Sequence, residues 1–330
     1  LRDLIDRSER SRGAIATMGR LPSQRALAAT LDRCENAGHG GHAPIDEVKN
    51  FLRLCRDGKV RLPEQIARHG LRLIKSKEAK RKLNDSELWL INEQVCYALL
   101  DTGEIDEATM IVKALSKRFP KSSRVLVLQG ALCECCGDYD KAEEVYKKIL
   151  EENEAHQGAW KRLCCVAKGR GDEEKAVKTL KEYLDVFCTD AEAWEELASL
   201  YLSLSMQKQA SFCYEECVLI QPQNPSYHLK YADSLYSLST PSTLHLARQA
   251  VGYYSVVLDL TNGSSVHAKY GLLCCLDAIR SQGRGSSSRL TEDEQKLAAK
   301  CARELEADYQ EKCPALLAHL RATGILPSGT

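Results

Sequence analysis

Fifteen cysteines and eight histidines are the residues of this 330-residue chain that could support metal binding or nucleophilic chemistry. The cysteines are densest at 133–136, with the sequence Cys-Glu-Cys-Cys, and in the pairs Cys164–Cys165 and Cys274–Cys275. Zinc sites favour Cys-x2–4-Cys pairs in loops with a second ligand pair nearby. No histidine forms an HExxH motif, and no glycine-rich nucleotide-binding motif is present. We therefore predict that the protein is not an enzyme and that it holds no metal and no cofactor.

The overall charge limits the classes of partner. The chain has 46 basic and 46 acidic residues, which argues against a nucleic-acid binder that depends on neutralising phosphates.

Cysteine is too sparse for a disulfide scaffold, and residues 1–30 show no signal-peptide pattern, so we expect a reducing compartment. No segment is apolar enough to span a bilayer, so any work at a membrane would depend on a partner.

The elements that position these residues come from a repeat. Four consecutive windows of 34 residues, 89–122, 123–156, 157–190 and 191–224, share a pattern. Position 20 is alanine in every window, position 15 is glycine in three windows and Ser205 in the fourth, and position 8 is always small. The residues concerned are Ala108, Ala142, Ala176 and Ala210 at position 20, Gly103, Gly137 and Gly171 at position 15, and Cys96, Gly130, Cys164 and Ala198 at position 8.

Each shared position has a physical cause. Small residues at positions 8 and 20 let two antiparallel helices, A and B, approach closely, and position 15 needs the left-handed backbone that ends helix A. Pro120 and Pro222 at position 32 stop helix B. Large residues at positions 4, 11 and 24 are expected to fill the core. Trp194 at position 4 is one of them, so that Trp194→Ala would cost about 3–5 kcal/mol. The pattern is that of the tetratricopeptide repeat, and it predicts an all-α solenoid, a right-handed superhelix of antiparallel helix pairs.

The repeat register assigns many cysteines to packing positions. Cys96 and Cys164 fall at position 8, Cys133 and Cys275 at position 11, and Cys217 at position 27. Cysteine behaves as a small apolar residue in such places. We predict that these thiols are structural.

The regular windows divide the chain into four parts. We predict a partly flexible extension at 1–43, a helical pair at 44–88, four regular repeats at 89–224, and irregular repeats with a capping helix at 225–330. Within the last part, 281–289 has the composition of a surface loop. Thr291 and Glu294 form a capping-box pattern that predicts a helix to about Tyr309.

Helix A of each repeat is expected to present positions 2, 5, 6, 9 and 12 to a concave surface that grips an extended or helical segment of a partner. Chaperone-docking repeats hold a terminal carboxylate there, but Glu196 occupies a position where that clamp needs asparagine. We predict partner contacts for Glu93, Tyr97, Val127, Lys161, Arg162, Glu195, Ser199, Leu229 and Asp233.

The N-terminal quarter of the chain is basic. Residues 1–88 carry 19 Lys and Arg against 12 Asp and Glu. The densest run consists of Lys75, Lys77, Lys80, Arg81 and Lys82. It could contact anionic lipid headgroups or an acidic partner; the alternative is a solvated helix end, where cations also suit the helix dipole.

Several segments also resemble one particular repeat family, subunit 2 of the endoplasmic reticulum (ER) membrane protein complex. The resemblance covers about 45–320 and is carried by EQIARHGLRLI at 64–74, WLINEQVCYALLDTG at 89–103, and AEAWEELASLY at 191–201. It implies a non-catalytic, peripheral subunit on the cytosolic face of the ER membrane. It further implies that the chain cradles cytosolic segments of the insertase-like subunit 3 and the tail of subunit 5, and binds soluble subunit 8 or 9. The implied activity is support of the insertion of tail-anchored and multi-pass membrane proteins. A soluble adaptor or co-chaperone-like assembly factor is the alternative function, and a repeat-containing enzyme comes third.

Overall fold

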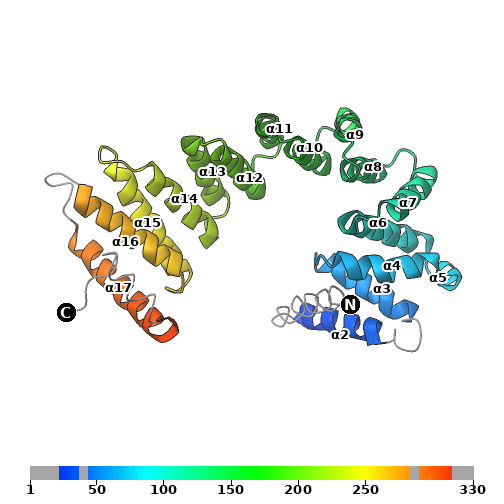
Figure 1. Cartoon of the computed structure of the whole chain (residues 1–330), viewed down its shortest axis with the longest axis horizontal. Coiled ribbons are helices and arrows are strands. Elements are labelled where there is room, and N and C mark those ends of the chain that lie inside the picture. Colours follow the sequence, from blue (N-terminus) through cyan, green and yellow to red (C-terminus); the bar gives the residue numbers. More distant parts are fainter. Residues whose placement is uncertain (1–21, 37–43, 283–289, 314–330) are drawn as a thin grey trace. The chain divides into compact units, whose positions relative to one another are not determined.

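The computed structural model describes residues 22–36, 44–282 and 290–313, and every regular element in these ranges is an α-helix (Figure 1). The helices are α2 Pro22–Asn36, α3 Ile45–Asp57, α4 Pro63–Lys75, α5 Lys77–Lys82, α6 Asp85–Thr102, α7 Ile105–Arg118, α8 Ser123–Cys135, α9 Tyr139–Glu152, α10 Gln157–Gly169, α11 Glu173–Val186, α12 Ala191–Ser203, α13 Gln207–Ile220, α14 Pro225–Leu238, α15 Leu244–Leu260, α16 Val266–Gln282 and α17 Glu292–Lys312. The fold is an all-α tetratricopeptide-repeat solenoid, as predicted.

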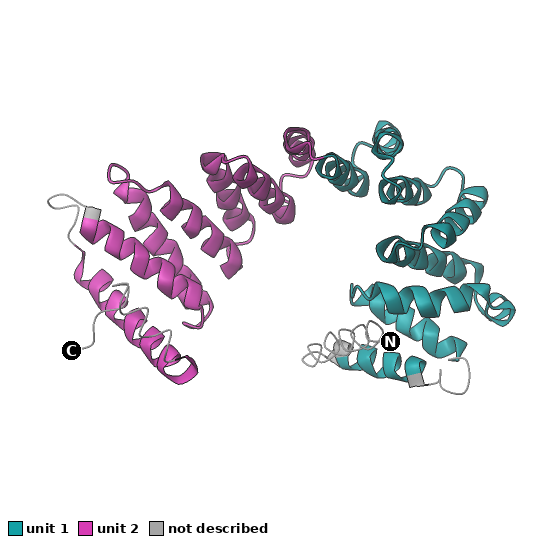
Figure 2. Ribbon diagram, in the orientation of Figure 1, with its two compact units in different colours: residues 1–170 teal, residues 171–330 magenta. Residues whose placement is uncertain are grey.

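The helices form two compact units, residues 1–170 and 171–330 (Figure 2). In unit 1, α4 packs on α6, and α6 to α10 then pack each on the next. In unit 2, α11 to α17 pack in the same way. Contacts between neighbours in the sequence therefore build each unit, as expected of a repeat protein.

The small positions of the repeat are confirmed as the closest points between helices A and B. All four position-20 alanines are fully buried, and Cys96, Cys164 and Ala198 at position 8 are also buried. At Gly130, the fourth position-8 residue, an added Cβ would lie 2.4 Å from the ring of Tyr146. The aromatic ring of helix α9 therefore occupies the space that glycine leaves on helix α8.

The turn between helices A and B confirms the role of position 15. Gly103, Gly137 and Gly171 have φ angles of 79°, 76° and 75°, and Ser205 adopts 59°. Left-handed backbone costs a non-glycine residue roughly 1–2 kcal/mol, so the fourth repeat has the turn of the others at a higher conformational cost. Pro120 and Pro222 each follow the last residue of helix B by two positions, where proline is expected to stop a helix.

Position 4 differs from the prediction. Trp194 is only partly buried, because its indole N–H donates a hydrogen bond of 2.9 Å to the Cys188 carbonyl in the loop before α12. Trp160 makes the same bond to Glu154, at 2.8 Å. The polar edge of the indole has to reach a carbonyl acceptor, so the ring stays at the edge of the helix pair. Position 24, also predicted to fill the core, does so in the second repeat, where Tyr146 is fully buried.

The described residues include parts of both predicted end segments. Within the predicted extension, residues 22–36 form α2, which packs on α3 with Leu27 and Leu31 buried; the rest of 1–43 lies outside the described residues. Of the loop predicted at 281–289, the first two residues end α16 and the others lie outside the described ranges. The capping box at Thr291 is confirmed, with reciprocal bonds to Glu294, and its helix continues to Lys312.

Candidate partner-binding surface

The A helices of unit 1 are α6, α8 and α10, and α8 contacts both of the others. We call their shared polar surface the A-helix face of unit 1. It is formed by Glu93, Tyr97, Asp101, Glu134, Lys161 and Arg162. Four of these six were named from the repeat positions. Glu134 was not named, although it stands at position 12, which the repeat pattern directs to this surface, and Asp101 at position 13 was not predicted.

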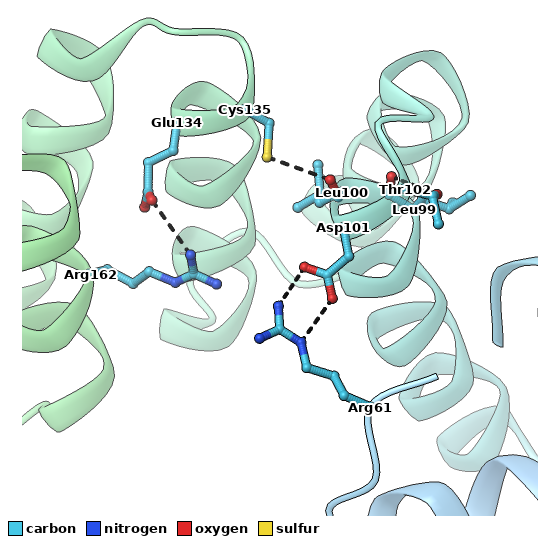
Figure 3. A network of polar contacts seen from close by, with 8 residues as sticks. All are labelled: Arg61, Leu99, Leu100, Asp101, Thr102, Glu134, Cys135 and Arg162. Carbon is cyan, nitrogen blue, oxygen red and sulfur yellow. Dashed lines mark hydrogen bonds and ion pairs between the residues drawn. The ribbon is translucent and has the colours of Figure 1, made fainter. Parts of the chain in front are cut away.

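Glu134 is the central carboxylate of this face. Its side chain is only 13% exposed, and it accepts a short hydrogen bond from the Tyr146 hydroxyl. Arg162 of the next A helix lies 3.5 Å from the other carboxylate oxygen. Figure 3 shows the Arg162 side chain directed at Glu134. Burial, and then the bond to Glu134, raise the pKa of Tyr146 well above its usual value. The network joins α8, α9 and α10, so Arg162 is held in place by buried groups.

A second ion pair lies beside the first. Arg61, in the connection between α3 and α4, binds both carboxylate oxygens of Asp101 at 2.7 and 3.1 Å (Figure 3). Such a bidentate geometry is the strong form of an Arg–carboxylate pair. The Arg61 side chain is 81% exposed, so the pair orders the surface more than it stabilises the fold.

Glu93 and Arg124 form a third pair, across α6 and α8. Both line a cavity of about 290 Å³, together with Trp89 and Phe119, whose rings meet edge to face at 5.6 Å. Glu93 is therefore placed beside an apolar recess, where it can contact both polar and apolar groups of a bound segment.

The remaining residues of unit 1 that were predicted to contact a partner differ in their exposure to solvent. Lys161 is exposed and Tyr97 half-buried, and burial raises the pKa of the Tyr97 hydroxyl. Val127 is only 8% exposed and packs in the core with Tyr146. Position 5 faces the core in α8 because this helix is apolar on several sides, so we do not retain Val127 as a partner contact.

In unit 2, the corresponding helices are α12, α14 and α16. Glu195 pairs with Lys230 between α12 and α14. Asp233 accepts a hydrogen bond of 2.6 Å from Tyr254 and lies 3.1 Å from His267 Nε2. Both predicted acids are thus engaged by side chains of neighbouring helices. Ser199 is exposed, and Leu229 is partly buried.

An apolar cavity of about 580 Å³ was missed by the sequence reasoning. It lies in unit 2, between α11 and α13, with Leu197 and Tyr201 of α12 also lining it. Phe212 lines it and is 53% exposed; its ring meets Trp194 edge to face at 6.0 Å. An exposed phenylalanine at position 22 of the repeat was the available signal.

The cysteines divide into buried and exposed groups, and all fifteen are free thiols. Cys96, Cys164, Cys217 and Cys275 are buried as predicted, whereas Cys133 is only partly so. Burial raises the pKa of Cys96 to about 12. Among the residues the structure describes, no group of three or more His, Cys, Asp or Glu side chains could hold a metal ion. The exposed thiols are Cys135, Cys136, Cys165, Cys188 and Cys313.

All five residues of the predicted basic run are exposed. Lys82 pairs with Glu78 one helical turn away at 2.7 Å. Within the described ranges, no helix has both the length and the apolar character needed to cross a membrane.

Comparison with known proteins gives three findings. The family model of the EMC2 TPR-like repeat domain matches residues 111–245. ER membrane protein complex subunit 2-A of Xenopus laevis is 33% identical, over 80% of this chain and 86% of the relative. The subunit 2 relative of Dictyostelium discoideum is 29% identical, over 72% of this chain and 75% of its own length.

Among solved structures, the C-terminal part of a TPR repeat-containing protein from Cytophaga hutchinsonii matches with a TM-score of 0.53. It covers 80% of this chain and 95% of that chain at 13% identity. At this identity, the match supports the fold alone.

Proposed function

Because the chain belongs to the family of subunit 2 of the ER membrane protein complex, we propose that it is a non-catalytic scaffold subunit of that complex. It works at the cytosolic face of the ER membrane as a peripheral protein. There it supports the insertion of tail-anchored and multi-pass membrane proteins by cradling cytosolic segments of the membrane-embedded subunits. Its proposed partners are the insertase-like subunit 3, the tail of subunit 5 and soluble subunit 8 or 9.

The observation that carries this proposal within the molecule is the A-helix face of unit 1. Three successive A helices present a polar surface whose side chains are tied by ion pairs and by the buried Glu134–Tyr146 bond. Side chains that are ordered before binding lose less conformational entropy when a partner docks. This arrangement suits the recognition of a segment that lies across several repeats.

The test uses Lys161, which is exposed on this face. Reversing Arg162 as well would bring a second carboxylate to the buried Glu134 and destabilise the fold, so Arg162 is left unchanged. Lys161→Glu is expected to lower the recovery of membrane subunits in affinity purification from detergent-solubilised membranes. Its thermal midpoint should match that of the unaltered chain.

Lys148→Glu is the matched control, because Lys148 is also an exposed lysine and lies on helix B of the preceding repeat. It should leave recovery unchanged. Equal recovery with both variants would remove the A-helix face of unit 1 as the docking surface. If the unaltered chain recovers soluble chaperones but no multi-pass subunits, the function is that of a soluble adaptor instead.

A further inference from the structure

The helices α4 and α5 carry a cationic surface larger than the basic run recognised in the sequence. Arg68, Arg72 and Lys75 are all exposed, and their spacing of four and three residues places them on one face of α4. Lys77, Lys80 and Arg81 of α5 are exposed as well. We call these six residues, Arg68, Arg72, Lys75, Lys77, Lys80 and Arg81, the α4–α5 cationic surface.

Packing fixes the direction of this surface. Gly70 lies on the opposite side of α4, where an added Cβ would be 2.2 Å from Val95 of α6. The close approach of α4 to α6 on that side turns the row of cations away from the core. In α5, the fully buried Ala79 anchors the short helix, and Figure 1 draws α5 at the end of α4, on the outside of the helices of unit 1.

The charge of this surface is largely uncompensated within the described part of the chain. None of the six cations is ion-paired there, whereas the neighbouring Lys82 is neutralised by Glu78. The other acids nearby are Glu64, which shares the face of Arg68, Asp85 at the start of α6, and Asp46 of α3, which lies close enough to Lys82 to help raise its pKa after the larger effect of Glu78. Between 64 and 85 there are seven Lys and Arg against three Asp and Glu.

The surface has no apolar anchor. From 61 to 89, no leucine, isoleucine, valine or aromatic side chain is exposed. Leu71 and Ile74 are half-buried against the core. Protein interfaces are centred on buried aromatic or aliphatic anchors, whereas clusters of four to eight cations bind anionic lipid by charge alone. The composition of the surface therefore favours a membrane over an acidic protein.

We propose that the α4–α5 cationic surface binds the anionic headgroups of a phospholipid membrane. The choice of a membrane rests in part on the proposed function, which places the chain beside one. Each cation near an anionic bilayer contributes about fivefold to the partition coefficient. Several of the six cations acting together hold unit 1 against the headgroups through α4 and α5, and no apolar side chain has to insert into the bilayer.

The experiment measures co-sedimentation of the full chain with vesicles. One set contains phosphatidylcholine alone, and the other contains phosphatidylcholine and phosphatidylinositol in equal amounts. The unaltered chain is expected to bind only the second set, and to lose this binding when salt is raised from about 0.1 M to 1 M, where the screening length falls to about 3 Å.

The variant removes four of the six charges by replacing Arg72, Lys75, Lys80 and Arg81 with glutamine. Its binding to the anionic vesicles should fall by about a hundredfold or more. The matched control replaces four exposed cations scattered over other helices with glutamine, and should lose no more than about fivefold. The control residues are Lys113, Lys117, Lys148 and Lys208.

A second variant tests whether positive charge at these positions is sufficient for binding. Lys75→Arg combined with Lys80→Arg keeps the charge and should keep the binding. The proposal is overturned if the unaltered chain does not distinguish the two vesicle sets, or if the scattered control loses as much binding as the four-cation variant. It is also overturned if the four-cation variant binds vesicles normally but no longer recovers protein partners, because the surface then docks an acidic protein. Membership of the complex is measured separately by affinity purification, so either proposal can fail without the other.

Discussion

A methyl group added at Gly130 tests the contact that sets the spacing of α8 and α9. In Gly130→Ala the new Cβ would lie 2.4 Å from two ring carbons of Tyr146 and 2.7 Å from its hydroxyl oxygen. Tyr146 is fully buried, and its hydroxyl is bound to Glu134, so the ring cannot move aside without breaking that bond.

The expected change in the free energy of unfolding has two unfavourable contributions and one favourable contribution. Overpacking of a buried contact costs about 1–3 kcal/mol, whereas exchanging glycine for alanine inside a helix gains about 1 kcal/mol. The loss of the Tyr146–Glu134 bond would add about 1.5–3 kcal/mol, as for a hydrogen bond to a charged group. With that bond lost, we expect a net destabilisation of about 1.5–5 kcal/mol, confined mostly to α8 and α9.

Amide hydrogen exchange measured by mass spectrometry is the suitable assay, because it reports the opening free energy of separate helices. Peptides from α8 and α9 should exchange faster in Gly130→Ala, and those from α15 should not. Gly252→Ala is the matched control: Gly252 also lies inside a helix, but nothing is within 4 Å of an added Cβ. That variant should gain about 0.5–1 kcal/mol. If Gly130→Ala stabilises its helices as Gly252→Ala does, the close contact at position 8 does not exist as described.

Three further predictions concern the repeats of unit 2 and the buried thiols. Ser205→Gly should stabilise the chain by about 0.5–1 kcal/mol in urea denaturation. Glycine relieves the left-handed strain at φ 59°, and this gain is only partly offset by the greater freedom of the unfolded chain. A loss of stability would contradict this. Trp194→Ala should cost about 2–3 kcal/mol in the same assay, less than a fully buried tryptophan, since the ring is partly exposed; a change below about 1 kcal/mol would refute the packing described. Burial raises the pKa of Cys96 and Cys275 from 9.0 to about 12, so these neutral thiols stabilise the fold below about pH 9 and this contribution is lost as pH rises towards 12. In the folded chain they should resist alkylation that modifies the exposed Cys188, and rapid labelling of Cys96 would show that its site is open.

The repeat positions were predictable because each depends on local geometry. An alanine at position 20 and a left-handed residue at position 15 are required wherever two antiparallel helices cross closely and reconnect in a short turn. The windows therefore predicted both the buried Ala108 and the positive φ of Gly103. Spacing along one helix also predicted the exposure of Lys161.

Contacts between residues of different helices or loops were harder to predict from the sequence. Spacing placed Val127 with the partner-facing residues, but the apolar contacts of α8 bury it. It assigned Trp194 to the core, but the carbonyl of Cys188 holds the indole at the edge of the repeat. Neither outcome could be derived from one helix alone, because each depends on an atom supplied by another segment.

The sequence by itself determined the class of fold, its register and the family to which the chain belongs. These properties follow from periodic side chains whose neighbours are close in the chain. The tertiary structure decided which charged side chains form ion pairs. It brought Arg162 to Glu134 and Arg61 to Asp101. Among the residues that the structure describes, it left Arg68 and Arg72 without an ion pair, on the same face as Lys75. Electrostatic interactions act through space between helices that are many residues apart, so only the packed helices distinguish a neutralised cation from an exposed one.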